Sequence, residues 1–454
     1  MSKHKDNLEL LSPAGDLTRL KYALAYGADA VYLGLPDFSL RAKTGFDFKS
    51  LKEGIAYAHK LKKKVYVIVN IFAHNSHLKK LPDFLKKLKV VKPDAIILSD
   101  PGVLTMVKKY LPKVPIHLST QANALNCEAV KFWYQNGVRR IILGREATLE
   151  DIKQIHKQVP KMELEVFVHG AMCMSYSGRC YLSAWLNSRS ANEGSCTQPC
   201  RWEYKMYMEE PLRPGMMIPL EEDDKGIYIL NSKDLCLIDY LGELAKAGVK
   251  SFKIEGRTKS HYYVAVATKA YRQAIDSIGV IASVAKQSHR KKNEIASSSL
   301  RTPRNDKSLQ TIKKELSKID NRGYTTGFLF GDEGIKRQEF TTSKQKSDWQ
   351  FVGEVVPGVI PAKAGISSEK HEIPVSTGMT GKQIVYFKPH NMLRAGDALE
   401  LLTPKDCYKI KVKEFFNKDG QSLKEIHGGT KNVYSFKLSK ECDTGWGILR
   451  KRIG

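Results

Sequence analysis

Five of the chain's eight cysteines lie between positions 173 and 236. They are Cys173, Cys180, Cys196, Cys200 and Cys236. Thiolates are soft ligands that bind iron–sulfur clusters or zinc in preference to magnesium or calcium. The stretch 177–202 is rich in Gly, Ser and Asn and poor in aliphatic residues, so it is not typical of a hydrophobic core. The pattern therefore predicts a metal site.

The spacing of these cysteines excludes two common metal sites. A zinc finger would show paired C-x2-C motifs, and a ferredoxin would place three ligands in one tight loop. Four of the five thiols would be enough for a 4Fe-4S cluster. Cys196 and Cys200 are four residues apart around a proline, so either of them could face the metal. Isolated Cys127, Cys407 and Cys442 are interpreted as small buried hydrophobic residues.

Eight short apolar segments alternate with helical patterns over residues 8–257 and predict the strands of repeated βα units. The predicted strands are 8–15, 29–35, 64–70, 94–100, 116–123, 140–146, 164–170 and 251–257. Eight units in about 250 residues match a closed (β/α)8 barrel of the TIM type better than an open sheet. About 80 residues separate the last two strands, and the cysteines lie in this long insertion.

Polar residues follow the predicted strands where strand interiors are apolar. In (β/α)8 barrels, the carboxyl ends of the strands form the mouth that carries the chemistry. The residues expected around this mouth are Asn70, Asp100, Gln121, Asn123, Arg145, Glu146, His169, Glu255 and Arg257. Because the cysteine insertion begins directly after the seventh strand, we expect it to lie at the same mouth.

The composition changes after the helix expected at 260–276. We assign residues 1–280 to the barrel, 281–345 to a basic linker or excursion, and 346–454 to a small C-terminal β-barrel domain. Five short alternating segments, starting at 348, 382, 397, 408 and 432, predict the strands of this domain. Residues 357–379 have no period of their own and are expected to form an inserted surface loop.

The chain is strongly basic, with 74 Lys and Arg against 48 Asp and Glu and a formal charge of +26. Such a charge favours a polyanionic partner, and nucleic acid is the first candidate because Lys and Arg neutralise its phosphates. A general preference for lysine on solvated faces is the alternative explanation. The sequence contains neither a signal peptide nor an apolar run long enough for a membrane span, so we expect a cytoplasmic protein.

Residues 165–183 resemble the signature of the collagenase-like peptidase family of unassigned catalytic type, with every signature position filled. Segments 9–34, 192–204, 232–236 and 252–272 are similar to the same family. In its length, its barrel and its C-terminal domain, the chain is most similar to the members of this family that hydroxylate tRNA. The resemblance implies hydroxylation of wobble uridine to 5-hydroxyuridine, a 4Fe-4S cluster and dependence on prephenate. It implies Cys173, Cys180, Cys196 and Cys236 as ligands, with Cys200 as the alternate.

Our leading hypothesis is an RNA-modifying enzyme whose partners are tRNA and a small acidic cosubstrate. Residues expected to be catalytic are His169, Glu255, Arg145 and Arg257. Residues expected to bind a cofactor or cosubstrate are Lys253, Gln121, Asn123 and Tyr176. Tyr176, Tyr181, Trp185 and Trp202 could stack on a flipped base, although packing is the more common role of such residues.

Two alternatives remain open at this stage. A cysteine peptidase would pair His169 with Cys173, four residues apart, although one nucleophile does not explain five cysteines. The HExxH and GxSxG motifs of other hydrolases are absent from the sequence. A zinc-stabilised RNA-binding protein without catalytic activity would explain the charge and the thiols. It would leave the polar residues of the mouth without a role. The oligomeric state is not predicted.

Overall fold

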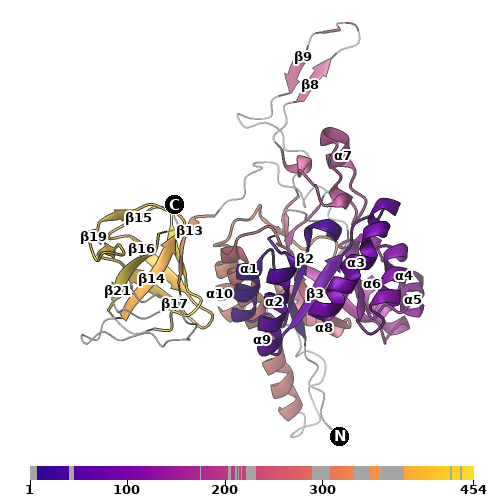
Figure 1. The fold of residues 1–454 in the computed structure, drawn as a ribbon, viewed down its shortest axis with the longest axis horizontal. Coiled ribbons are helices and arrows are strands. Elements are labelled where there is room, and N and C mark those ends of the chain that lie inside the picture. The colour runs from indigo at the N-terminus through magenta and orange to yellow at the C-terminus, as the bar shows by residue number, and fades with distance from the viewer. Residues whose placement is uncertain are drawn as a thin grey trace. The chain divides into compact units, whose positions relative to one another are not determined.

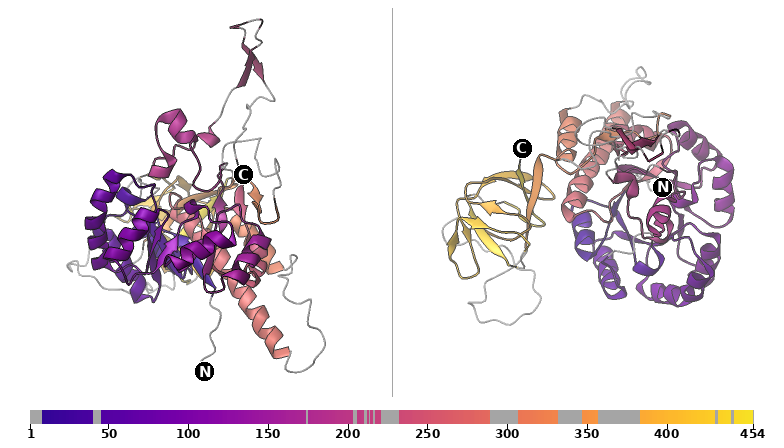
Figure 2. Two further views of the ribbon diagram at one scale, coloured as in Figure 1. Left: turned by 90° about the vertical axis from the view of Figure 1, so that its right-hand side faces the viewer. Right: turned by 90° about the horizontal axis from the view of Figure 1, so that it is seen from above.

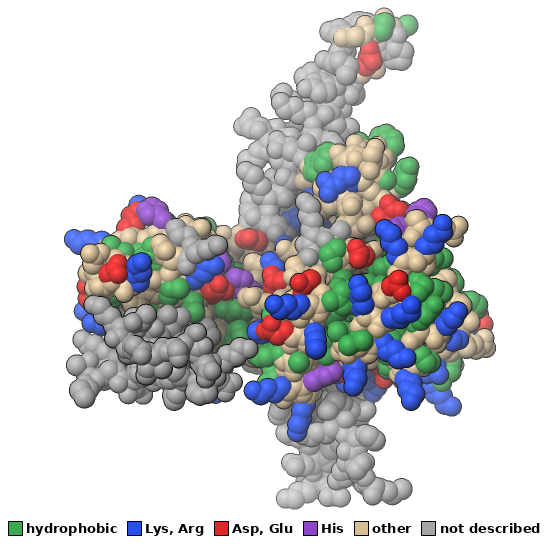
Figure 3. Space-filling model, viewed as in Figure 1, with side chains coloured by type: hydrophobic (Ala, Val, Ile, Leu, Met, Phe, Trp, Pro, Cys, Tyr) green, Lys and Arg blue, Asp and Glu red, His purple; other side chains and the backbone are tan. Residues whose placement is uncertain are grey.

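The computed structural model describes residues 8–39, 45–173, 175–202, 232–288, 307–331, 347–356, 383–429, 432–439 and 442–453, with short pieces between 206 and 220. The chain divides into two compact units, Met1–Lys346 and Ser347–Gly454. Within the described residues, no helix has the length and apolar character that a membrane span requires. Lys and Arg side chains are interspersed with acidic ones over the visible face of the first unit (Figure 3).

Eight parallel strands form a closed barrel in the first unit (Figure 1). They are β1 (Glu9–Pro13), β2 (Ala30–Gly34), β3 (Lys64–Val69), β4 (Ala95–Leu98), β5 (Ile116–Leu118), β6 (Arg140–Ile142), β7 (Glu163–Ala171) and β11 (Val249–Ile254). Neighbours pair in chain order, and β11 closes the ring by pairing with both β1 and β7. The predicted (β/α)8 barrel is confirmed, and each predicted strand overlaps one barrel strand.

Helices surround these strands, as the view from above in Figure 2 shows. They are α1 (Leu17–Ala25), α2 (Phe48–Lys60), α3 (Asn75–Val91), α4 (Pro101–Tyr110), α5 (Cys127–Gln135), α6 (Leu149–Gln158), α8 (Leu241–Lys246) and α9 (His261–Ser288). Several begin at a capping side chain; Asp100, for example, accepts the Val103 N–H at 2.8 Å. The strands are buried on both faces, which explains their continuous apolar runs.

The insertion between β7 and β11 contains short elements of its own. They are α7 (Leu182–Asn187), η3 (Ala191–Glu193), η4 (Pro199–Arg201), β8 (Met206–Glu209), β9 (Met217–Leu220) and β10 (Asp234–Cys236), followed by η5 (Ile238–Tyr240). Two further 3-10 turns, η1 (Pro36–Phe38) and η2 (Thr120–Ala122), follow β2 and β5. Strand β10 pairs antiparallel with β7 and so extends the barrel sheet at this point.

Part of the segment predicted as a linker over 281–345 belongs to the barrel unit. Helix α10 (Lys307–Leu316) packs on α9 and buries Leu309, Ile312 and Leu316. Strand β12 (Tyr324–Thr325) pairs with β10. The buried residues of α10 are spaced three and four positions apart, which is typical of a helix. The basic composition of the segment concealed this pattern. Residues 289–306 and 332–346 lie outside the described part of the chain.

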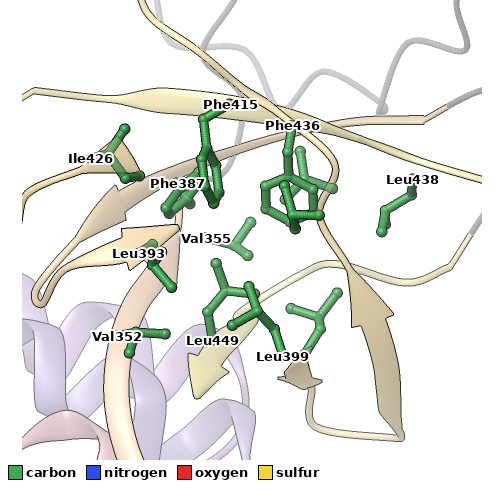
Figure 4. Packing of buried hydrophobic residues seen from close by; sticks show 13 residues of the cluster. Val352, Val355, Phe387, Leu393, Leu399, Phe415, Ile426, Phe436, Leu438 and Leu449 are labelled. Carbon is green, nitrogen blue, oxygen red and sulfur yellow. The ribbon is translucent and has the colours of Figure 1, made fainter. Parts of the chain in front are cut away.

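The second unit is an antiparallel half-barrel. Its eight-stranded sheet has the order β17 (Cys407–Lys411), β16 (Ala398–Leu402), β22 (Ile448–Arg452), β13 (Trp349–Val355), β14 (Gln383–Pro389), β21 (Tyr434–Leu438), β18 (Phe415–Phe416) and β19 (Ser422–Leu423). A smaller pair joins β15 (Leu393–Arg394) and β20 (Glu425–Ile426). Phe387, Phe415 and Phe436 lie at the centre of its core (Figure 4). The loop predicted at 357–379 lies outside the described residues.

Candidate functional site

Arg145 and Glu255, two of the residues predicted to be catalytic, form an ion pair at the carboxyl end of the barrel. Arg145 follows β6, and Glu255 comes directly after β11. Arg145 Nη2 lies 3.2 Å from Glu255 Oε2, and the guanidinium carbon lies 4.2 Å from the ring centre of Phe167. The two side chains are 13% and 23% exposed, so solvent still reaches the pair. These two residues meet as the mouth hypothesis predicts.

Lys253, predicted to bind a cosubstrate, is instead buried in an ion pair with Glu165. Its Nζ lies 2.8 Å from Glu165 Oε1, and the lysine is 3% exposed. Burial lowers the pKa of Lys253, although the Glu165 carboxylate opposes this shift. Glu165 also lies 3.2 Å from Arg140 Nη1. The Lys253 ammonium group is therefore held by a structural partner.

Arg257, predicted to be catalytic, is packed against the end of β2 and is only 6% exposed. Its Nη1 donates to Ser39 Oγ at 2.7 Å. A side chain at Gly34 would bring its Cβ within 2.7 Å of the same nitrogen, so glycine leaves room for the guanidinium group. This arrangement indicates that Arg257 holds the β2 turn rather than facing the solvent at the mouth.

His169, the fourth side chain predicted to be catalytic, is buried among tyrosine rings. The rings of Tyr263, Tyr271 and Tyr324 have their centres 5.9, 5.3 and 5.7 Å from the imidazole centre. The histidine is 2% exposed, and burial lowers its pKa to about 3. The imidazole is therefore neutral near pH 7, and its position corresponds to packing between β7 and α9.

The pairing that a cysteine peptidase would need is not found among the described residues. His169 Nδ1 lies 3.5 Å from the Tyr271 hydroxyl, whereas Cys173 is exposed and has no hydrogen bond to the imidazole. A general base must come within hydrogen-bond reach of the group that it activates. The geometry of this dyad does not support a thiol nucleophile at Cys173.

Gln121 and Asn123 lie at the mouth after β5, as predicted. Asn123 ends the η2 turn with a φ of 49°, a left-handed conformation that Asn tolerates better than most residues. Four buried side-chain atoms in this region have no hydrogen-bond partner among the residues that the structure describes. They are Gln121 Oε1, Asn123 Oδ1, Arg145 Nε and Glu146 Oε2. Clustered unpaired polar atoms require an explanation in a native structure, and binding of a polar ligand is one such explanation.

The aromatic residues of the insertion are exposed rather than packed. Tyr176 is 58% exposed, Tyr181 72%, Trp185 71% and Trp202 41%. None of the four is buried in a core, although the Trp202 indole N–H donates to the Thr197 carbonyl at 3.3 Å. Exposed aromatic rings beside a polar mouth can stack on unpaired bases.

The insertion lies over the carboxyl ends of several barrel strands. Phe72, just after β3, donates its backbone N–H to the Asn192 carbonyl at 3.1 Å. Gly178 packs directly on Gln121, because a Cβ there would lie 2.3 Å from the Gln121 carbonyl oxygen. These contacts hold the cysteine-bearing segment against the mouth, as its place in the sequence predicted.

Four cysteines of the insertion lie near one another. Burial raises the pKa of the Cys200 thiol; Arg201 lowers it, and the neighbouring thiols of Cys173, Cys196 and Cys180 raise it further. Cys173 is exposed and the other three are partly buried. The Cys196 sulfur also accepts the Gln198 N–H at 3.4 Å. The Cys200 thiol is within electrostatic range of the other three, and thiolates are the donors that iron–sulfur clusters and zinc prefer.

A hydroxyl and amide network fixes the segment that carries Cys196 and Cys200. Thr197 Oγ1 lies 3.0 Å from Ser183 Oγ and accepts the Asn187 amide at 2.9 Å. The Thr197 N–H also donates to Ser183 Oγ at 3.0 Å. Ser183 and Asn187 belong to α7, so the network ties the two cysteines to that helix. These residues could not be predicted from the sequence, because no spacing pattern marks such a network.

Cys236, which the family resemblance implied as the fourth ligand, lies in different surroundings. It ends β10 and pairs in register with His169. Its sulfur lies 3.7 Å from the Tyr271 hydroxyl, and burial raises the pKa of its thiol. Cys200, the alternate residue, is the thiol on which Cys173, Cys180 and Cys196 act electrostatically.

Comparison with known proteins gives relatives along nearly the whole chain. A tRNA hydroxylation protein P from Escherichia coli strain K12 is 40% identical over 98% of this chain and 97% of its own length. A tRNA hydroxylation protein P1 from Bacillus subtilis strain 168 is 32% identical over 95% of this chain and 92% of its own length. The solved structure of the U32 peptidase Mk0906 is 13% identical, covers 56% of this chain and 96% of its own, and gives a TM-score of 0.37.

A family model adds the last piece of evidence. Peptidase family U32 matches residues 15–339, which include barrel strands β2 to β7 and β11, the cysteine insertion and α10. The match confirms the resemblance found in residues 165–183 and in the flanking segments. This chain is a member of peptidase family U32.

Proposed function

We propose that this chain is a tRNA-modifying enzyme required for hydroxylation of wobble uridine to 5-hydroxyuridine. The observation that carries the proposal is its similarity to tRNA hydroxylation proteins over 98% of its length, both units included. The dense positive charge of +26 supports an RNA partner, because phosphate neutralisation dominates protein–RNA affinity. The absence of a histidine–cysteine dyad among the described residues removes the main support for a peptidase.

A 4Fe-4S cluster fits the thiols of the insertion. Cys173, Cys180, Cys196 and Cys200 would hold it, since the Cys200 thiol is within electrostatic range of the other three. Each supplies one thiolate, and the Gln198 N–H at Cys196 is the kind of hydrogen bond that tunes such clusters. When bound, the cluster would supply redox or Lewis-acid chemistry next to the barrel mouth. Cys236 would remain a structural residue of β10.

The mouth beside the thiols has the groups needed to bind a base. A uridine must leave its stack before its ring carbon can react, and anticodon loops already present unstacked bases. The exposed rings of Tyr176, Tyr181 and Trp185 would stack on such a base. Gln121 and Asn123, whose side-chain oxygens have no partner, would bind its polar edge.

A small acidic cosubstrate, prephenate in our proposal, would bind at Arg145. Its Nε has no partner, and its ion pair with Glu255 leaves it partly exposed. Guanidinium groups bind carboxylates in bidentate geometry. Lys253 and Arg257 are held by Glu165 and Ser39, and His169 is buried, so these three support the barrel around the site rather than bind ligands.

Anaerobic purification of the complete chain tests this proposal. We expect a brown protein that contains iron and acid-labile sulfide in equal amounts, because four thiolates select an iron–sulfur cluster or zinc. A colourless protein with stoichiometric zinc would contradict the enzyme proposal and support an RNA-binding protein. Hydrolysis of gelatin that disappears in Cys173→Ser would instead support a peptidase.

A further inference from the structure

Residues 174–179 form the loop that joins Cys173 to Cys180, and its described part is seated on the barrel at Ser177 and Gly178. Gly178 has a φ of 74°, in the left-handed region that favours glycine. A Cβ at this position would lie 2.3 Å from the Gln121 carbonyl oxygen and 3.0 Å from two other backbone atoms of that residue. Since backbone atoms cannot move aside, the loop reaches its position only with glycine at 178.

Glu146 holds the residue before this glycine. The Ser177 N–H donates to Glu146 Oε1 at 2.7 Å, and the Ser177 hydroxyl lies 3.3 Å from the same oxygen. The Arg145 N–H also donates to Ser177 Oγ at 3.4 Å. A hydrogen bond to an ionised carboxylate is stronger than one between neutral groups. Glu146 is thus the main polar anchor of the loop that carries two of the proposed ligands.

The Glu146 carboxylate is not engaged elsewhere in the described part of the chain. Its neighbour Arg145 pairs with Glu255 instead, and Glu146 Oε2 has no hydrogen-bond partner. A Cβ at Gly144 would lie 2.8 Å from Glu146 Oε2 and 2.9 Å from Asn123 Oδ1. The carboxylate therefore occupies a space that only glycine leaves open, and its one set of contacts is with the loop.

We propose that Glu146 is a positioning residue that fixes the Cys173–Cys180 loop at the barrel mouth before any metal binds. This inference rests on the proposed cluster, because the loop matters for function only if its two cysteines are ligands. Groups that orient metal ligands from outside the ligand set typically change metal affinity tenfold or more when replaced.

The test compares Glu146→Ala and Glu146→Gln with a matched control, Glu193→Gln. Glu193 also joins the insertion to the barrel unit, through an exposed contact of 3.0 Å with His74 Nε2. We expect Glu146→Ala to lose its cluster to a chelator about tenfold faster than the wild type. Glu146→Gln should show a smaller effect, because its amide oxygen still accepts the Ser177 N–H. Glu193→Gln should match the wild type, since exposed ion pairs contribute little.

A second measurement uses the metal-free protein and separates this inference from the proposed function. Hydrogen exchange of peptides covering 173–180 should be faster in Glu146→Ala than in both the wild type and Glu193→Gln. Equal exchange and equal cluster loss in all variants would overturn the positioning role. A wild type without iron would refute the cluster, while the exchange result would still decide whether Glu146 anchors the loop. If Glu146→Ala does not fold, Glu146→Gln supplies both comparisons.

Discussion

The thiols of Cys200 and Cys236 differ in their neighbours, although both are partly buried. Cys200 lies among Cys173, Cys180 and Cys196, and its backbone segment is tied to α7. Cys236 lies between the Tyr271 hydroxyl and the β7 register partner His169. Sequence spacing left Cys196 and Cys200 as alternatives, and Cys236 was implied by the family resemblance alone, because the surroundings of each thiol depend on how the insertion folds.

We therefore predict opposite effects for two serine substitutions. Cys200→Ser should abolish iron loading, because the cluster would lose one of four thiolate ligands. Cys236→Ser should retain iron at the wild-type level, since it removes only a contact with Tyr271. Iron and sulfide analysis of anaerobically purified protein measures both. Full loading of Cys200→Ser together with loss of iron in Cys236→Ser would assign the fourth ligand to β10.

Glu165 is the residue on which the buried charges of the barrel depend. It is fully buried and contacts both Lys253 and Arg140. Removing its charge would leave Lys253 without its carboxylate partner in a site that water does not reach. Breaking a buried ion pair by removing one partner costs about 3–5 kcal/mol.

Glu165→Gln should thus lower the free energy of unfolding by about 3 kcal/mol. Glu163→Gln is the matched control, because Glu163 contacts the same Arg140 at 2.8 Å but is 52% exposed. That control should lose less than about 1 kcal/mol. Chemical denaturation of both variants gives the comparison. Equal losses of unfolding free energy in the two variants would show that burial does not determine how much the Glu165 ion pairs stabilise the fold.

At the scale of elements, side-chain hydrogen bonds tie the segment that carries Cys196 and Cys200 to α7. Thr197→Val keeps the shape of the side chain but removes the hydroxyl that bonds Ser183 and the Asn187 amide. We expect a local loss of about 1 kcal/mol and faster hydrogen exchange over 196–202. Thr105→Val, which removes an exposed hydroxyl bond on α4, is the control and should leave this exchange unchanged. Unchanged exchange in Thr197→Val would contradict the proposed tie.

The barrel strands could be predicted from sequence because their signal is local. Strands β3 and β4 are buried runs of apolar residues, and eight such runs specify a closed barrel. The roles of His169, Lys253 and Arg257 could not be predicted, because each is a polar residue near a strand end whose partner comes from a distant part of the chain. Tyr271 lies 102 residues from His169, and Ser39 lies 218 residues from Arg257.

At the scale of the whole molecule, the charge of +26 should control how the chain meets RNA. We predict that affinity for tRNA falls by at least about tenfold between 50 and 200 mM salt, because each neutralised phosphate releases counterions. Filter binding of the complete chain at several salt concentrations measures the slope. An affinity independent of salt would exclude phosphate contacts as the main source of binding.

The central claim is that thiols gathered at a barrel mouth support hydroxylation of tRNA uridine. It is tested most directly by mass spectrometry of tRNA nucleosides from cells that lack every other uridine hydroxylation pathway and carry either this chain or its Cys200→Ser variant. We predict 5-hydroxyuridine-derived nucleosides with the wild type and none with the variant. Equal amounts of these nucleosides from the wild-type and variant strains would contradict the claim. So would their absence from the strain that carries the wild-type chain, if that chain is loaded with iron.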